Sequence, residues 1–437
     1  MQRQVISACA QMYKKSKTMR YPCFDDIEVS RDWAFENVRS TEQWTHGYHR
    51  YPAKFLPNVV KKIIEDHKLV DCVVADFFAG CGTTLVEAKV HGISSVGTDI
   101  NPIATLITRV KTTPIEPLYL EASYNVLVEK FNEYRERDYS EVVTHERLDY
   151  WFRPEEKGKI AYLYAIVNRI EDVAIKEFFL VSISHILKNC SWWLQSSTKP
   201  QRDPHKDIPD PFESFKKHTS QMLRGNQEFY NELQNRGFLD VPCDISLADA
   251  RKTPIADNSV DVVITSPPYV TSYEYADIHQ LTGYWMEYFS DILAFRKQFI
   301  GTSYSDNRSS DTNGSALARK IVSQLLEKDK RMAYDVANYF NDMQSVANEM
   351  YRVVRKGGLA CIVIGNTTYK DVHVRSAEVF FNHLIHAGFR KKDVIKRNIP
   401  NKLMPTLRDK RTGKFTTLDN KDCKQVYPDE YILIVKK

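Results

Sequence analysis

The residues best suited to chemistry are a serine, two prolines and a tyrosine that follow the β-branched run at 260–265: Ser266, Pro267, Pro268 and Tyr269. Because each proline fixes φ and lacks an N–H group, this turn presents carbonyl oxygens and the serine hydroxyl. Such a pocket accepts hydrogen bonds, and the adjacent ring can stack on a flat ligand. The turn therefore predicts a site for a planar ring that carries an exocyclic amine.

A second candidate site is the turn of small residues at 79–84, which follows the apolar run 70–76 and precedes residues with helical spacing. Backbone N–H groups are free at such a strand-to-helix turn, and Gly80 and Gly82 let a ligand approach the main chain. The alternative is a turn used only for tight packing. A nicotinamide-binding pattern would place a third glycine where this chain has Leu85.

Asp99 ends the next strand-like run, at 94–99. A carboxylate in this position accepts hydrogen bonds from both hydroxyls of a ribose, which predicts a ligand with an unphosphorylated ribose. The alternative is that Asp99 caps a helix, since Asn101 and Pro102 follow it.

The elements that must position these residues alternate between strand and helix. The first part of the chain reads as strand, glycine turn, helix and strand, which is a βαβ unit. Further strand-like runs occur at 260–265, 359–364 and 431–435, and a long polar helix is expected over 317–354. This alternation predicts an α/β fold with a mostly parallel sheet.

A helical region interrupts the sheet. Long amphipathic helices are expected at 119–136 and 157–190, and the proline-rich, charged segment 196–206 continues neither a helix nor a strand. We therefore expect three parts: an N-terminal arm at 1–45, an α/β domain at 46–112 and 246–437, and a helical insert at 113–245.

Together, the glycine turn at 76–82 and the Thr-Ser-Pro-Pro-Tyr segment at 265–269 resemble those of the amino-group DNA methyltransferases, which modify N4 of cytosine or N6 of adenine. The resemblance covers roughly residues 46–112 and 245–437. It implies that the α/β domain at 46–112 and 246–437 is the catalytic domain and that the insert at 113–245 is a candidate target-recognition lobe. It implies a Rossmann-like fold with a mostly parallel seven-stranded sheet, S-adenosylmethionine as cofactor, and double-stranded DNA with a flipped target base as substrate.

The resemblance also implies which residues contact the cofactor. The segment before the glycine turn would line its methionine side, the turn would wrap its methionine and ribose parts, the acid of the second strand would hold the ribose, and the acid after the third strand would meet the adenine amino group. In that order the residues are Tyr51, Pro52, Lys54, Phe55; Asp76, Phe78, Ala79, Gly80, Gly82, Thr83, Thr84; Asp99, Ile100, Asn101; and Asp249, Ala250.

By the same resemblance, Ser266 and the Pro267 carbonyl would accept hydrogen bonds from the target amine, and Tyr269 would stack on the flipped base. Cytosine N4 is the expected target, because adenine-directed members more often have Asp or Asn in place of Ser266. Adenine N6, an RNA amino group, and a catalytically silent nucleic-acid-binding module are the alternatives. Such enzymes often work beside a restriction endonuclease, which makes one a possible partner.

The charge distribution points to a polyanion. Lys and Arg number 61 against 56 Asp and Glu, a balance of +5, yet residues 396–414 alone hold seven basic residues and one acid. Basic loops of this kind contact phosphates, although a solvated loop without function is the alternative. The insert segment 199–206 and the polar loop 301–314 are weaker candidates. The basic residues expected to bind DNA are Lys199, Arg202, Arg308, Arg397, Lys402, Arg408, Lys410 and Arg411.

Other classes of site find little support. The eight cysteines form no CxxC pair and suit a reducing cytoplasm, where we expect the protein. Cys243, after a proline, resembles a C5-cytosine nucleophile but precedes Asp249 of the third strand and does not follow the fourth strand, so a small buried thiol is preferred. His46 and His49 lack metal-ligand partners at suitable spacing and are expected in a loop or on the substrate side, with no metal. A secretory leader and a membrane span are not expected.

Overall fold

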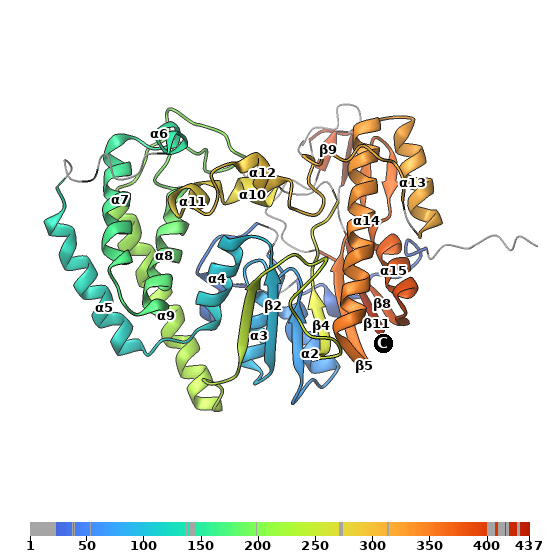
Figure 1. The fold of residues 1–437 in the computed structure, drawn as a ribbon, viewed down its shortest axis with the longest axis horizontal. Helices are drawn as coiled ribbons and strands as arrows, with labels where there is room; N and C mark the ends of the chain where they lie inside the picture. Colours follow the sequence, from blue (N-terminus) through green and yellow to red (C-terminus); the bar gives the residue numbers. More distant parts are fainter. Residues whose placement is uncertain are drawn as a thin grey trace, which may run out of the picture.

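The structure is a computed structural model that describes residues 23–36, 38, 40–52, 54–135, 139, 145–197, 199–270, 274–312, 314–399, 407–409, 416, 419–425 and 429–437. Its centre is a seven-stranded sheet with the order β3-β2-β1-β4-β5-β11-β8 (Figure 1). The strands are β1 (Val73–Asp76), β2 (Ser94–Asp99), β3 (Cys243–Leu247), β4 (Val260–Thr265), β5 (Val354–Ile364), β8 (Arg390–Asn398) and β11 (Asp429–Lys436).

The sheet is mostly parallel, as predicted. β1 lies between β2 and β4 and is parallel to both, β2 is parallel to β3, and β4 is parallel to β5. Only β11 runs against its neighbours, β5 and β8. The chain therefore builds outward from β1 in one direction and from β4 in the other. The carboxyl ends of these two strands meet where the order reverses, which is where ligands bind in open α/β sheets.

Helices cover both faces of the sheet because the strands are apolar on both sides. One face packs against α2 (Pro57–Asp66), through Val59, Val60 and Ile63, and is extended by α3 (Thr83–Val90) and α4 (Pro102–Thr112). The other face packs against α13 (Ala316–Leu326), α14 (Lys330–Val353) and α15 (Ser376–Ala387). The expected single helix over 317–354 is thus two helices. The second begins after Asp329, whose side chain accepts a hydrogen bond from the Met332 N–H and caps it.

The region 113–245 is mostly helical and ends in the first residues of β3, and its helix limits differ from the expected ones. It contains α5 (Pro117–Glu129), the 3-10 turn η3 (Lys130–Glu133), α6 (Glu146–Trp151), α7 (Pro154–Asn168), α8 (Val173–Leu187) and α9 (Pro211–Arg236). The expected helix over 157–190 divides into α7 and α8, because Asp172 caps a new helix by accepting from the Ile175 N–H. The sheet resumes at Cys243, just before residue 246.

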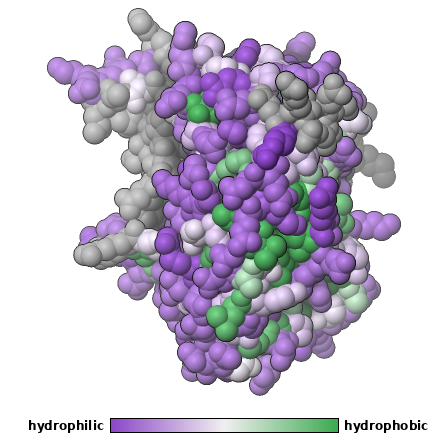
Figure 2. Space-filling view, turned by 90° about the vertical axis from the view of Figure 1, so that its left-hand side faces the viewer, coloured by the Kyte–Doolittle hydropathy of each residue, from purple (hydrophilic) through white to green (hydrophobic). Residues whose placement is uncertain are grey.

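These insert helices share an apolar cluster with α4, which fixes them beside the sheet. Figure 1 shows them as a separate layer next to α3 and α4. Figure 2 shows a band of apolar surface on the side of the molecule where the insert helices lie. Leu118 and Val126 of α5 are exposed apolar side chains.

Three short helices, α10 (Tyr275–Ile278), α11 (Gln280–Trp285) and α12 (Ile292–Arg296), lie between the insert and α14 (Figure 1). The smaller elements are 3-10 turns at η1 (Arg31–Trp33) and η2 (Trp44–Gly47), and two hairpins, β6 (Thr367–Tyr369) with β7 (Val372–Val374) and β9 (Leu407–Asp409) with β10 (Cys423–Gln425). Within the described ranges, no helix has the length and apolar character needed to cross a membrane.

Candidate active site

The glycine turn follows β1 and adopts a conformation that requires glycine at two positions. Gly80 has φ +53° and Gly82 has φ +78°, both in the left-handed region. A Cβ atom at Gly82 would also lie 2.9 Å from the Thr108 side chain, and one at Gly80 would touch the Tyr51 ring at 3.4 Å. The Tyr51 ring therefore lies over the partly exposed Gly80 main chain, and Gly82 packs against α4.

Side chains below the turn hold it in place. Asp76 accepts a hydrogen bond from the Phe78 N–H at 3.0 Å, and the Ala79 N–H donates to the Thr98 carbonyl. Asp76, Thr83 and Thr84 are almost fully buried. These three side chains, which the sequence placed in contact with a cofactor, therefore shape the turn from beneath.

Asp99 closes the turn from the end of β2. Its Oδ2 accepts a hydrogen bond from the Gly80 N–H at 2.8 Å, and its Oδ1 accepts from the Asn101 N–H at 2.9 Å. Burial raises the pKa of Asp99 to about 6. The helix-cap alternative for Asp99 is wrong, because Asn101 is the N-cap of α4 and accepts from the Ile103 N–H.

The side chain of Asn101 is engaged at both ends. Its amide nitrogen contacts His279 Nδ1 at 3.1 Å, and the residue is 1% exposed. Asn101 therefore fixes the start of α4 and its junction with α11, and its side chain has little surface left for a ligand.

Only part of the segment before α2 lies near the glycine turn. The Tyr51 ring lies 5.2 Å from the His279 ring and stacks on Tyr275 at 6.1 Å. Lys54 instead pairs with Glu42 at 2.7 Å, and Phe55 packs on the apolar cluster beneath α2. Of the residues expected on the methionine side, the structure thus brings Tyr51 to the turn and ties Lys54 and Phe55 to other parts of the fold.

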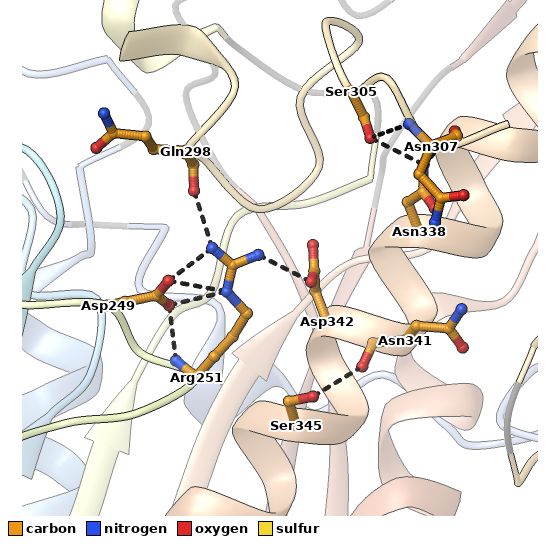
Figure 3. Close-up of polar contacts among 9 residues, drawn as sticks. All are labelled: Asp249, Arg251, Gln298, Ser305, Asn307, Asn338, Asn341, Asp342 and Ser345. Carbon is orange, nitrogen blue, oxygen red and sulfur yellow. Dashed lines mark hydrogen bonds and ion pairs between the residues drawn. The ribbon is translucent and has the colours of Figure 1, made fainter. Parts of the chain in front are cut away.

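Asp249, after β3, is held by Arg251 (Figure 3). The Arg251 guanidinium donates to both Asp249 oxygens, to Asp342 Oδ1 at 2.9 Å and to the Gln298 carbonyl at 3.1 Å. Asp249 Oδ1 also accepts from the Arg251 main-chain N–H at 2.8 Å, so four contacts with Arg251 engage both carboxylate oxygens. A carboxylate has about four lone-pair positions, so a ligand amine would have to replace one of these contacts. Ala250 is buried in the core and supports the bend from below.

The Ser-Pro-Pro-Tyr turn follows β4 and is bonded to the end of β1. Thr265 Oγ1 donates to Asp76 Oδ1 at 2.5 Å, so the two motifs are neighbours at the point where the strand order reverses. The Ser266 hydroxyl donates to the Val363 carbonyl at 3.1 Å. This bond occupies the only hydroxyl hydrogen, which leaves the Ser266 oxygen to act as an acceptor.

The two proline carbonyls differ in their partners. The Tyr339 hydroxyl, from α14, donates to the Pro268 carbonyl at 3.0 Å. Among the described residues, none donates to the Pro267 carbonyl. Ser266 Oγ and the Pro267 carbonyl are therefore two candidate acceptors on one turn. Tyr339 was not predicted, because nothing in the spacing of α14 indicates which of its residues reaches the turn.

The basic residues expected to contact DNA have different environments. Arg397 does not present its charge to a ligand: it is 2% exposed and pairs with Glu430 at 2.7 Å, which corrects that expectation. Lys199 and Arg202 are exposed, and Arg202 lies over the Tyr150 and Trp192 rings. Lys402, Lys410, Arg411 and the Arg408 side chain lie outside the described residues.

Arg308 lies on a loop that is fastened to α14. Asn307 Nδ2 donates to Asn338 Oδ1 at 2.7 Å, and Asn338 Nδ2 donates to Ser305 Oγ at 3.2 Å (Figure 3). Arg308 itself is half exposed and lies 3.7 Å from Asp335. It keeps an accessible guanidinium on an anchored loop.

The histidines expected in a loop or near substrate are buried instead. His46, in η2, contacts Glu87 at 2.9 Å, and His49 contacts Ser184 at 2.9 Å. Burial lowers the pKa of both histidines, so they are neutral parts of the packing.

No cluster of three metal-ligating side chains occurs in the part of the chain that the structure describes. Burial also raises the pKa of Cys243, which suits an inert thiol and not a nucleophile.

The fold and these two adjacent motifs define a Rossmann-like methyltransferase. The sequence profile of the N6/N4 DNA methylase family matches residues 3–108 and 260–437, which is more than half of the chain. The protein therefore belongs to this family and is an S-adenosylmethionine-dependent DNA methyltransferase. The match begins at residue 3, so it includes most of the arm that the motif resemblance left out, and it omits the helical insert.

Two curated relatives agree with the family assignment by name. The chain is 28% identical over 399 residues to the type II methyltransferase M.MvaI of Kocuria varians, covering 84% of this chain and 87% of that protein. It is 24% identical to the type II methyltransferase M.MjaII of Methanocaldococcus jannaschii, covering 77% and 79%. An S-adenosylmethionine-dependent methyltransferase of Methanosarcina mazei aligns with a TM-score of 0.30 at 8% identity, covering 86% and 96%.

The residues present fit this cofactor. Main chain is partly exposed at Gly80, which has no side chain to block a ligand, and the Asp99 carboxylate lies against it, while Gly82 packs on Thr108 and sets the turn. When bound, S-adenosylmethionine supplies a methyl group on a positively charged sulfur.

Proposed function

We propose that this enzyme methylates the N4 amine of a cytosine that has been turned out of duplex DNA. The observation that carries the proposal is the hydrogen bond between Thr265 and Asp76, which joins the acceptor-rich Ser-Pro-Pro-Tyr turn to the cofactor turn. Two relatives bear the name type II methyltransferase, which supports DNA as the substrate. A restriction endonuclease as partner is part of the proposal.

In this proposal the cofactor lies along the glycine turn. The main chain at Gly80 and Gly82 follows its methionine and ribose parts, while Tyr51 covers them from the side of α10. Asp99 accepts from the ribose hydroxyls, and Ile100 packs on the adenine. Asp249, oriented by Arg251, accepts from the adenine amino group.

Ser266 and Pro267 act on the target amine. The amine lone pair is delocalised into the ring, which makes the nitrogen a poor nucleophile. Hydrogen bonds from its two N–H groups to Ser266 Oγ and to the Pro267 carbonyl favour a pyramidal nitrogen with a localised lone pair. Holding this amine about 3 Å from the reacting carbon in a dry pocket contributes several kcal/mol to catalysis. Transfer is direct and uses no covalent enzyme intermediate.

The choice of cytosine rests on Ser266. Adenine N6 is the second candidate, because either base offers two N–H groups to the same two acceptors. Lys199, Arg202 and Arg308 are the described residues proposed to contact phosphates, together with Lys402, Arg408, Lys410 and Arg411. Exposed arginines over aromatic rings, such as Arg202, suit a nucleic-acid surface.

Nucleoside analysis separates these possibilities. The enzyme is incubated with tritiated S-adenosylmethionine and either unmodified genomic DNA of mixed sequence or RNA, and the labelled nucleosides are identified by chromatography. N4-methylcytosine supports the proposal. N6-methyladenine would replace it with the second candidate, and label confined to RNA, or no label despite DNA binding, would contradict it.

The affinity for S-adenosylmethionine should depend on pH through Asp99. Ribose hydroxyls donate hydrogen bonds, so they require the ionised carboxylate. Because burial raises the pKa of Asp99 to about 6, the group is ionised above this pH and affinity is constant there. Below it, the dissociation constant should rise by about tenfold per pH unit.

Isothermal titration calorimetry between pH 5 and 8 measures this dependence. Asp99→Asn is the matched control, since it has the same shape and no titrating group, and its dissociation constant should lack the step near pH 6. The same step in both proteins would assign it to another group.

A further inference from the structure

A buried chain of three polar side chains ends at the tyrosine of the Ser-Pro-Pro-Tyr turn. The Tyr269 hydroxyl donates to Glu430 Oε2 at 2.8 Å, and Glu430 Oε1 accepts from the Arg397 guanidinium at 2.7 Å. Glu430 and Arg397 are opposite each other on the antiparallel strands β11 and β8. Both are buried, with exposed fractions of 8% and 2%.

Stability alone gives no reason for this chain. A buried ion pair contributes little net stability, because removing two charges from water offsets their attraction, and apolar residues of similar size often serve as well. A phenylalanine at 269 would likewise fill the same space without a buried hydroxyl. The chain instead connects the last two strands of the sheet to the turn that carries the acceptors.

The tyrosine ring is also confined along its edge. A Cβ atom at Gly365, just after β5, would lie 2.7 Å from Tyr269 Cε2, so the ring packs directly on the main chain there. The neighbouring Pro268 carbonyl is held by the Tyr339 hydroxyl. The bond to Glu430 fixes the remaining freedom, which is the position of the ring's hydroxyl end.

We propose that Glu430, oriented by Arg397, is a positioning residue that fixes the Tyr269 ring in the plane that receives the flipped base. This inference rests on the proposed role of Tyr269 as the stacking surface. Because the ring is already fixed, it loses no conformational entropy when the base binds. It also places the amine edge of the base against Ser266 and the Pro267 carbonyl. Loss of the bond should therefore slow methyl transfer more than it weakens DNA binding.

The test compares single-turnover methylation rates on a duplex that carries a mapped target site. Tyr269→Phe removes the hydroxyl and keeps the ring, and it should slow transfer by about tenfold, with the dissociation constants for DNA and cofactor within about threefold of normal. Tyr431→Phe is the matched control. It removes a hydroxyl from the residue that follows Glu430 on β11, and the methylation rate of this variant should be unchanged.

A second variant removes the partners. The double substitution Arg397→Met with Glu430→Leu replaces the ion pair by apolar side chains and leaves no charge unpaired. It should slow transfer as much as Tyr269→Phe does, and adding it to Tyr269→Phe should slow transfer no further, because both changes break one bond. Arg397→Gln with Glu430→Gln keeps an oxygen facing Tyr269 and should recover most of the rate, even if the apolar pair fails to fold.

The outcomes separate this inference from the proposed function. If the unmodified enzyme does not methylate the duplex, the proposed function fails. If it does, and Tyr269→Phe transfers at the normal rate, the positioning role is wrong. Multiplying rate losses in the combined variant would also contradict it, since they would show that the two sites act independently.

Discussion

Ser266→Ala should lower the single-turnover rate of methyl transfer by about 100-fold while leaving the dissociation constant for DNA within about twofold. Ser266 Oγ donates its hydrogen to the Val363 carbonyl at 3.1 Å, so its oxygen is left to accept a hydrogen bond from the amine, as proposed. The alanine variant loses this acceptor at the moment when the amine nitrogen becomes positively charged. The measurement is rapid-quench methylation with tritiated cofactor, paired with DNA binding by fluorescence anisotropy.

Ser259→Ala is the matched control for this result. Ser259 is exposed and directly precedes β4, whereas Ser266 directly follows it, so both variants remove one hydroxyl next to the same strand. The control should transfer methyl at the normal rate. A Ser266→Ala enzyme that retains full rate would show that the hydroxyl does not contact the amine.

Asp99→Ala should raise the dissociation constant for S-adenosylmethionine by about 100-fold, because charged hydrogen bonds contribute about 1.5–3 kcal/mol each. The variant loses the proposed acceptor for the ribose. It also loses the partner of the Gly80 N–H, so the turn itself loosens. DNA affinity should stay unchanged, and methylation should recover when the cofactor concentration is raised.

Asp244→Ala serves as the control for Asp99→Ala. Asp244 is exposed on β3, the strand next to β2, and is opposite Val96. Removing its carboxylate should not alter cofactor binding in calorimetry. Equal cofactor affinity in Asp99→Ala and the unmodified enzyme would remove Asp99 from the site.

The sheet could be predicted from the sequence because its strands are short β-branched runs with turn residues at their ends. The runs 260–265 and 359–364 both became central parallel strands. The glycine turn and the Ser-Pro-Pro-Tyr turn could be placed for the same reason, since each follows such a run. Their proximity then follows from the reversal of strand order between β1 and β4.

Helix limits were less predictable because single capping residues decide them. Asp172 and Asp329 each cap the start of a new helix. The helical spacing of apolar residues continues across both positions, so periodicity alone predicts one long helix in each place. The signal was present in the sequence, since aspartate is a preferred N-cap.

The partners of charged residues could not be predicted, because they depend on register. Counting charges placed Arg397 with the basic loop, but its position in β8 sets it opposite Glu430, far away in the chain. His46 similarly meets Glu87 only after α3 packs on η2. Arg251 is different, since it lies two residues from Asp249 and its guanidinium can reach that carboxylate locally.

The geometry proposed for methyl transfer is tested most directly by a crystal structure. The crystal would contain the enzyme, S-adenosylhomocysteine or a stable sulfonium analogue, and duplex DNA with the unmodified target site. We expect the target base outside the helix, stacked on Tyr269, with its amine bonded to Ser266 Oγ and the Pro267 carbonyl and about 3–3.5 Å from the position of the transferable methyl group. A cofactor whose sulfur faces away from Ser266, or a target base that remains in the duplex while the complex is catalytically competent, would contradict it.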